Sequence, residues 1–246
     1  IQEMSDSIRQ QAMVVAELER HHKHSRETLL KLIRLRESPY FGRIDFTESG
    51  TSDTETIYIG IASFMDEATQ QFYVYDWRAP ISSLFYDHSP GKAEYATPSG
   101  TIEGTVERKY QYVIRGGKLL FMFDTGVTIG DEVLQQALGR NADTRMRSIV
   151  ATIQSEQNRI IRSSGKTVFV QGAAGSGKTS VALQRVAYLL YKYRNAISVD
   201  NMVLFSPNPI FNAYVSNVLP ELGEANIRQT TFQEYVELRL GGTCRV

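Results

Sequence analysis

Residues 172–179 read GAAGSGKT and match the pattern G-x-x-x-x-G-K-[ST] at every specified position. A short apolar run, TVFV at residues 167–170, comes before this stretch, and a helical run, SVALQRVAYLLYKYR at residues 180–194, follows it. A strand, a glycine-rich loop and a helix in this order distinguish a phosphate-binding loop from an accidental match. The sequence therefore predicts a P-loop. The apolar face of the following helix is expected at Val181, Val186, Leu189 and Leu190.

The residue types of this loop suit the binding of a nucleoside triphosphate. Glycines let the backbone curl so that its N–H groups point at phosphate oxygens, and the positive end of the helix dipole adds to the attraction. Lys178 supplies a cation for the β- and γ-phosphates, and the Thr179 hydroxyl is placed to ligate Mg²⁺. We therefore predict ATP and Mg²⁺ as cofactors, with Lys178 and Thr179 as catalytic residues. The residues expected to hold the nucleotide are Gly172, Ala173, Ala174, Gly175, Ser176, Gly177, Lys178, Thr179 and Ser180.

The composition is that of a globular protein without a general affinity for nucleic acid. Of the 246 residues, 42% are hydrophobic and 22% are charged, a balance that supports a folded core. Lys plus Arg and Asp plus Glu both total 27, so the formal net charge is zero. A generally basic surface is therefore excluded, although a local basic groove is not.

Cysteine and histidine usage indicates neither disulfides nor a zinc site. The single cysteine, Cys244, cannot form an internal disulfide, and His21, His22 and His24 sit together without thiol partners. The chain shows no signal peptide and no run of about 18 uncharged apolar residues. We therefore expect a reducing, cytoplasmic location and no contact with a membrane.

Residues 1–37 contain no Gly or Pro and fit a heptad repeat. Seven of the ten seam positions are apolar, which is typical of the a/d seam of a coiled coil. We therefore predict that residues 1–37 form a helical arm that is part of a coiled coil. The seam positions are Ile1, Ile8, Val15, His22 and Leu29 in one register and Met4, Gln11, Leu18, Ser25 and Leu32 in the other.

Residues 38–127 are predicted to form a separate, β-rich domain. Short alternating runs rich in Tyr, Phe, Ile and Val, including QFYVYDWRAPISSLFYD at residues 71–87, are separated by SG, SPG, PSG and RGG turns. This spacing predicts antiparallel hairpins in a small sheet or open barrel. Trp77, Arg78 and Pro80 allow two interpretations, since an aromatic beside a basic residue can stack on single-stranded nucleic acid or simply pack in a core.

Residues 128–246 are predicted to form the first part of the P-loop domain together with its preceding helices. A helical pattern covers residues 128–162, and Asp131 and Asp143 are plausible helix caps or first-turn acids. This pattern links the β-rich domain to the loop.

A further strand is expected at residues 202–205 and a helix at residues 208–222. Together with the P-loop they predict a parallel α/β sheet whose ligand lies at the carboxyl ends of the strands. No apolar strand ending in Asp-Glu follows the loop. We therefore expect this chain by itself to bind ATP weakly and to hydrolyse little of it.

Several stretches resemble the opening motifs of UvrD/Rep-type superfamily 1 helicases: IQSEQN at residues 153–158, the P-loop stretch, LFSPN at 204–208 and TFQ at 231–233. The resemblance implies a partial RecA-like ATPase core, in which Gln157 reads the adenine edge. Gln233 stands where that family commonly has His, which weakens the expectation of strand binding. The residues that the resemblance places on single-stranded DNA are Ser206, Asn208, Thr231 and Phe232.

A longer resemblance is to the HelD family of helicase-like ATPases. It is carried by PYFGRIDF at residues 39–46, YIGIASFMDE at 58–67, YDWRAPISSLFYD at 75–87 and LFSPNPIFNAYVSNVLPELGE at 204–224. This resemblance implies that the N-terminal arm binds core RNA polymerase. It also implies that the ATPase promotes release of polymerase from nucleic acid and its recycling.

Two other functions remain compatible with the sequence. One is a DNA helicase that translocates on single-stranded DNA in replication or repair, with Asn208 and Phe232 on its track. The zero net charge and Gln233 weigh against it. The other is a protein-binding module with a vestigial P-loop, which the intact pair Lys178-Thr179 makes the weakest of the three.

Overall fold

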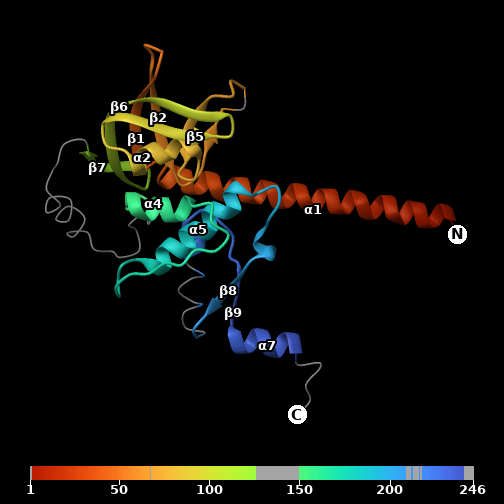
Figure 1. Ribbon diagram of the computed structural model, residues 1–246. Helices are drawn as coiled ribbons and strands as arrows, with labels where there is room; N and C mark the ends of the chain where they lie inside the picture. The colour runs from red at the N-terminus through yellow and green to blue at the C-terminus, as the bar shows by residue number, and fades with distance from the viewer. Residues whose placement is uncertain are drawn as a thin grey trace.

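The computed structural model describes residues 2–66, 68–125, 150–208, 212, 216 and 218–240. Over these residues, a β-rich sheet lies beside the helices that flank the glycine loop, and one long helix extends away from them (Figure 1). None of the described helices combines the length and the apolar character that crossing a membrane requires.

The long helix α1 runs over Gln2–Glu37 without interruption, which confirms the helix predicted for residues 1–37. Leu35 is buried at the end nearest the sheet, whereas the seam residues Leu18 and Leu29 are 54% and 58% exposed. Figure 1 shows the N-terminal part of α1 reaching away from the rest of the chain. In the described part of the chain no second helix lies along the seam, so the coiled-coil pairing stays a prediction.

Seven strands form the main sheet, in the order β3-β4-β2-β1-β6-β5 with β7 paired to β6. Neighbours are antiparallel except β2 and β4, which are parallel. The predicted antiparallel sheet is therefore confirmed except at this one pair, because β3, which lies between β2 and β4 in the sequence, pairs antiparallel with the other edge of β4. The strands are β1 Gly42–Glu48, β2 Thr54–Gly60, β3 Phe64–Met65, β4 Phe72–Asp76, β5 Gly91–Thr97, β6 Gly100–Arg115 and β7 Lys118–Asp124.

The second half of the run 71–87, which was expected to be β, is helical. It forms a 3₁₀ turn, η1 (Pro80–Ser82), followed by α2 (Ser83–Asp87). Pro80 stands at the start of the turn, where its fixed φ suits a helix and its missing N–H is not needed. The Ser83 hydroxyl donates to the Pro80 carbonyl at 2.8 Å, and the helical turn buries Leu84 completely.

The remaining elements follow residue 150. A two-stranded parallel sheet pairs β8 with β9 and confirms the strand expected at residues 202–205. Within the helix expected at 208–222, the described residues 212, 216 and 218–221 are helical, whereas 208 is in a bend and 222 is in a turn. Asp131 and Asp143 lie outside the described residues. The elements are α4 Ser155–Arg162, α5 Lys178–Lys192, η2 Val199–Asn201, β8 Val203–Ser206, β9 Arg228–Thr231 and α7 Phe232–Leu240.

The strand predicted at residues 167–170 is wrong for this structure. These residues have no regular secondary structure, and the Phe169 side chain is 93% exposed. A strand needs a neighbour for its backbone hydrogen bonds. Among the described residues β8 pairs with β9 and with no third strand, so the apolar run TVFV has no sheet to join.

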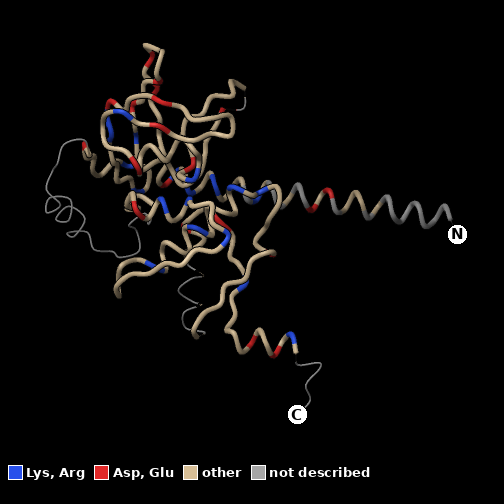
Figure 2. The backbone as a smooth tube through the Cα atoms, viewed as in Figure 1, with Lys and Arg blue, Asp and Glu red and all other residues tan. Residues whose placement is uncertain are grey.

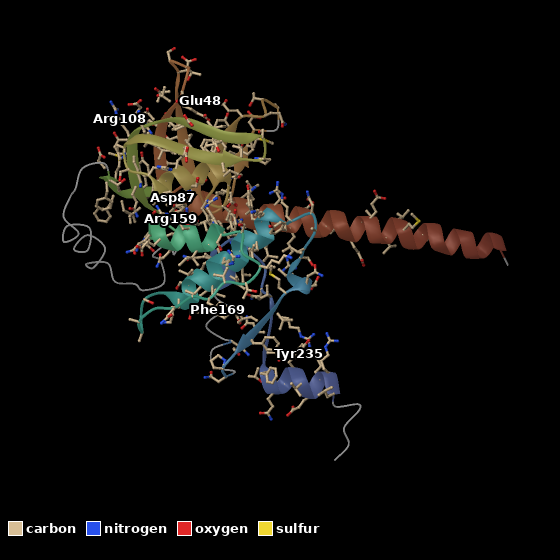
Figure 3. The ribbon with its side chains drawn as sticks, in the orientation of Figure 1. Glu48, Asp87, Arg108, Arg159, Phe169 and Tyr235 are labelled. Carbon is tan, nitrogen blue, oxygen red and sulfur yellow. The ribbon has the colours of Figure 1, made fainter. Side chains whose placement is uncertain are left out.

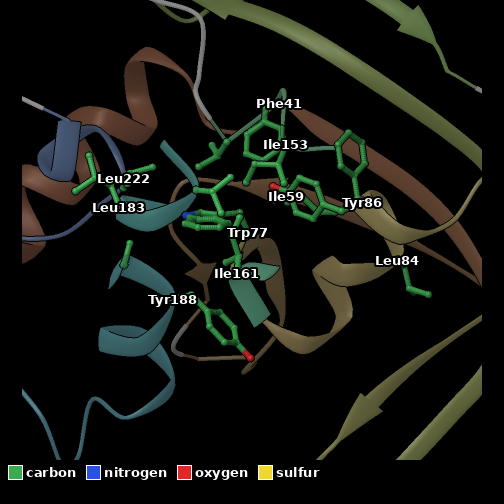
Figure 4. Packing of buried hydrophobic residues seen from close by; sticks show 14 of the residues in the cluster. Phe41, Ile59, Trp77, Leu84, Tyr86, Ile153, Ile161, Leu183, Tyr188 and Leu222 are labelled. Carbon is green, nitrogen blue, oxygen red and sulfur yellow. The ribbon is translucent and has the colours of Figure 1, made fainter. Parts of the chain in front are cut away.

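One hydrophobic core spans the β-rich sheet and the helices around the glycine loop. Trp77, at the end of β4, is completely buried with Ile161 of α4 and Leu183 of α5 in the same cluster (Figure 4). Of the two interpretations of Trp77, core packing is therefore right, and its ring is not available to a nucleic acid. Leu222 joins the cluster from the C-terminal side of the chain. The sheet and the helices thus fold against each other.

Arg78 crosses the boundary between the sheet and the helices. It is 5% exposed and donates two hydrogen bonds to Asp76, at 2.8 and 2.7 Å. Its other terminal nitrogen donates to the Glu224 carboxylate and to the Ala187 carbonyl of α5. Burial disfavours the charged guanidinium, but these carboxylates outweigh burial and raise the pKa of Arg78. Arg78 therefore stays charged, and it stabilises two buried or half-buried acids.

We expect Arg78→Ala to lower the free energy of unfolding by about 3–5 kcal/mol, because it leaves the buried Asp76 carboxylate without its cation. Urea unfolding measures this change. Arg36→Ala is the matched control, since Arg36 forms an exposed ion pair with Glu37 at 3.4 Å, and its loss should cost at most about 0.5 kcal/mol. Equal effects of the two substitutions would contradict the stabilising role of Arg78.

Candidate nucleotide-binding site

The glycine loop has the backbone geometry that its glycines make possible. Gly175 and Gly177 have φ of +80° and +82°, in the left-handed region that side chains rarely adopt. At Gly172, an added Cβ would lie 2.6 Å from the Ser176 hydroxyl oxygen. The loop curls back on itself, and the Ser176 N–H donates to the Ala173 carbonyl at 3.3 Å. A curl of this kind directs successive amide N–H groups toward one point and suits an anion.

Lys178 lies at the junction of the loop and α5. Its ammonium donates to the carbonyls of Gly172 and Ala173 at 2.8 and 2.6 Å, so the cation lies across the mouth of the curl. Lys178 is also the first residue of α5, whose first bond runs from the Val181 N–H to the Gly177 carbonyl at 2.9 Å. A phosphate entering the loop would compete with the two carbonyls for the ammonium.

Thr179 and Ser180 form the first turn of α5, and both are half-buried. The first N–H groups of a helix have no partner within the helix, and they carry the positive end of its dipole. Thr179 therefore lies in the helix turn that directly follows the loop, and Ala174, within the loop, is exposed. The residues predicted to hold the nucleotide therefore comprise the glycine loop and the first turn of α5.

Gln157 of α4 comes to the glycine loop from twenty positions upstream. Its amide nitrogen lies 3.4 Å from the point that a Cβ on Gly177 would occupy. Its amide oxygen accepts the Gln154 N–H at 3.1 Å, in a capping box at the start of α4. The structure therefore brings Gln157 and the loop together, as the predicted site requires.

Two arginines that were not singled out from the sequence hold α4 in place. Arg185 of α5 donates to the carbonyls of Ile160, Ile161 and Ser163 at 3.0, 3.0 and 2.9 Å. These carbonyls lie at the C-terminal end of α4, where the helix itself offers no donors. Arg162 binds elsewhere, to three backbone carbonyls at the end of β4. Neither residue lies in a spacing pattern that could have predicted its role.

The face of α5 that packs in the core differs from the predicted one. Val181 and Leu190 are buried as expected, whereas Val186 and Leu189 are half-buried. Both still pack against the core, and Tyr188 and the polar Gln184 are buried in addition to the predicted residues. The buried residues of α5 are Val181, Leu183, Gln184, Ala187, Tyr188 and Leu190.

The residues expected on single-stranded DNA lie at the carboxyl ends of β8 and β9. Ser206 and Thr231 are partners in the parallel pair. Ser206 is buried, and its hydroxyl donates to the Asn208 carbonyl at 3.2 Å. The Thr231 hydroxyl accepts the Glu234 N–H at 3.2 Å and thus caps α7. Both hydroxyls therefore have structural partners.

Asn208 and Phe232 are the exposed members of this group, and Phe232 is 70% exposed. The Phe232 ring lies 6.2 Å from the Phe205 ring, centroid to centroid. Gln233, in the position where a His was expected, donates from its amide to Glu237 at 2.9 Å. The exposed surface at this end of the two strands is therefore aromatic.

We expect Arg185→Ala to loosen the C-terminal half of α4, because several backbone carbonyls lose their charged donor. Amide hydrogen exchange in α4 should speed up by about tenfold, which corresponds to about 1.4 kcal/mol. Arg194→Ala is the control, since Arg194 donates to a single carbonyl, that of Tyr191, at 3.2 Å. Unchanged exchange in α4 of Arg185→Ala would show that Arg185 does not hold this helix.

Comparison with known protein families accounts for both parts of the chain. The family model described as DNA helicase IV HelD, N-terminal domain, matches residues 2–143, which is more than half of the chain. The model described as UvrD/REP helicase N-terminal domain matches residues 153–206, which include Gln157 and the glycine loop. No curated protein sequence matches the chain. The chain therefore belongs to the HelD family of superfamily 1 helicase-like proteins, and it joins a HelD N-terminal domain to sequence of the UvrD/REP helicase type.

Proposed function

We propose that this chain is part of an ATP-dependent, helicase-like protein that binds RNA polymerase in the cytoplasm and promotes its release from nucleic acid and its recycling. The observation that carries the proposal is the joining of a curled glycine loop to a HelD-type domain through one continuous core. In this arrangement, a nucleotide-dependent step at the loop has a mechanical path to the β-rich sheet and to α1.

The nucleotide part of the proposal rests on the loop. Lys178, which now binds two loop carbonyls, would bind the β- and γ-phosphates, and Thr179 would ligate Mg²⁺. Bound Mg²⁺ would neutralise part of the phosphate charge. Proteins commonly bind this metal through a few side chains together with oxygens of the substrate phosphates. Gln157, beside Gly177, would read the adenine edge. The parallel pair of β8 and β9 supports a RecA-like core around this loop.

The polymerase part of the proposal rests on α1. A helix of 36 residues is about 54 Å long, which is long enough to enter a deep channel of a large partner. Figure 2 shows that basic and acidic residues are both present on the described part of this helix. Between them, α1 exposes large apolar side chains that a partner could cover. These are Met13, Val14, Val15, Leu18, Leu29, Leu30, Leu32 and Ile33.

A DNA helicase that translocates on single-stranded DNA is the second candidate. The exposed Phe232 beside Phe205 favours it, because aromatic rings stack on bases without regard to sequence. The hydrogen bonds of Ser206 and Thr231 within the fold, described above, weigh against it. The polymerase-binding function is therefore the one that we place first.

We expect Lys178→Ala to weaken ATP binding by about 30- to 100-fold, because the phosphates lose a charged hydrogen-bond donor. Isothermal titration calorimetry with ATP and Mg²⁺ measures this loss. Lys166→Ala is the control, since Lys166 is an exposed lysine just before the loop. The ATP affinity of this variant should equal that of the unmodified chain. Equal affinities of Lys178→Ala and the unmodified chain would favour a binding module with a vestigial loop.

We expect deletion of residues 1–28 to abolish capture of purified core RNA polymerase after nuclease treatment. This deletion keeps Leu35, the buried residue at the end of α1, so the sheet should stay folded. ATP affinity, measured in the same preparation, should not change. Full retention of polymerase by the shortened chain would remove α1 as the contact, and retention on single-stranded DNA alone would favour the helicase.

A further inference from the structure

Helix α4 contacts the glycine loop at one end and the β-rich sheet at the other. Gln157, in its first turn, lies against Gly177. Arg162, its last residue, extends toward the turn that follows β4. A displacement of Gln157 on binding a nucleotide would therefore be carried to Arg162 by the helix that joins them, since both residues lie in α4.

Arg162 fixes this turn through its backbone. It donates to the carbonyl of Trp77 at 2.8 Å and to those of Arg78 and Ala79 at 3.2 Å each. Three charge-assisted bonds to consecutive carbonyls specify both the place and the orientation of the guanidinium. A fourth bond, from the Arg162 Nε to the Asn158 amide oxygen at 3.0 Å, ties the side chain to its own helix.

Asn158 extends the same connection to α2. Its amide nitrogen donates to both oxygens of Asp87 at 3.0 Å, and Asn158 is completely buried. It stands next to Gln157 in the sequence, so the residue beside the predicted adenine contact is itself bound to the β-rich part. Figure 3 shows Asp87 and α4 close together.

Helix α4 is also bound to α5, on the side of the glycine loop. The Arg162 guanidinium lies 5.2 Å from the centre of the Tyr188 ring of α5, and Arg185 of α5 binds carbonyls at the same, C-terminal end of α4, as described above. Because α5 begins at Lys178, α4 and α5 form one unit that includes both the phosphate side and the adenine side of the site. Arg162 makes the hydrogen bonds from α4 to the turn at residues 77–79, and Arg78 of that turn donates to the Ala187 carbonyl of α5.

We propose that Arg162 is a positioning residue that couples the nucleotide site at Gln157 to the turn at residues 77–79 of the β-rich sheet. Arg162 does not contact the nucleotide, and its effect is exerted through α4. Since coupling between two sites is reciprocal, a restraint on residues 77–79 would also change the affinity of the loop for the nucleotide. This inference rests on the proposed nucleotide binding at the loop.

The chain contains its own reporter for this coupling. Trp77 is the single tryptophan, it is completely buried, and its carbonyl is one of the three that Arg162 binds. Its ring lies 5.8 Å from the Arg78 guanidinium. A shift of the turn against Arg162 changes the distance between this ring and a charge, and tryptophan emission responds to such a change.

The experiment titrates the 246-residue chain with ATP and Mg²⁺ and follows Trp77 emission and binding heat in parallel. We expect the emission to change and to saturate at the ATP concentration that calorimetry gives. In Arg162→Ala, ATP binding should persist within about tenfold, while the emission change should fall to less than about a fifth. Arg162→Lys should restore part of the change, because a lysine can still donate to one of the carbonyls.

Two further variants separate coupling from a simple loss of packing. Arg159→Ala removes an exposed arginine of the same helix and should leave the emission change intact. Gln157→Ala removes the predicted adenine contact, so it should weaken ATP binding and, at saturating ATP, lose the emission change, because α4 no longer follows the nucleotide. If Arg162→Ala fails to fold, as judged by near-ultraviolet circular dichroism, Arg162→Lys and Gln157→Ala carry the test.

The outcomes distinguish this inference from the proposed function. Absence of binding heat with the unmodified chain overturns the nucleotide site and this inference with it. Normal binding heat without an emission change in the unmodified chain overturns the coupling alone. A full emission change in Arg162→Ala also overturns the coupling, and it would assign to Arg162 a purely structural role.

Discussion

Two arginines cross the boundary between the β-rich sheet and the helices of the loop, in opposite directions. Arg78 leaves the end of β4 and reaches α5 and Glu224, and Arg162 leaves α4 and reaches the turn after β4. The two arginines also contact each other, since the Arg162 guanidinium donates to the backbone carbonyl of Arg78. The placement of the loop relative to the sheet depends on this crossed pair.

Arginine suits this boundary for a physical reason. A guanidinium is planar, stays charged when buried and offers several donors in fixed directions, so one side chain can satisfy several carbonyls and a carboxylate at once. Both guanidiniums also lie near tyrosine rings of α5, at 4.9 Å for Arg78 and Tyr191 and at 5.2 Å for Arg162 and Tyr188. A lysine would supply one charge without these directions. The boundary thus has charged groups with fixed hydrogen-bond directions at its centre, and Trp77 and Leu222 pack around them.

The errors of the sequence analysis have a common origin. The run TVFV at residues 167–170 has the composition of a strand, but a strand exists only where a neighbour accepts its hydrogen bonds. The run ISSLFYD at residues 81–87 alternates poorly and was expected to be β because of its aromatics. Pro80 before it and the burial of its apolar side chains in the core favour a helix instead. In α5 the buried face is wider than the predicted stripe, because Gln184, Ala187 and Tyr188 are buried as well. In each case tertiary contacts overrode a local preference.

The sequence by itself determined the features that depend on local chemistry. A glycine-rich loop with Lys178 and Thr179, a long helix without Gly or Pro, and a series of short β-strands all follow from residue types at short spacing. The tertiary structure alone decided that Gln157 lies beside Gly177, that Trp77 is buried, and that Arg162 binds the turn after β4. These contacts join residues 20 to about 85 positions apart, and no periodicity in a sequence specifies which donor will meet which carbonyl across such a distance.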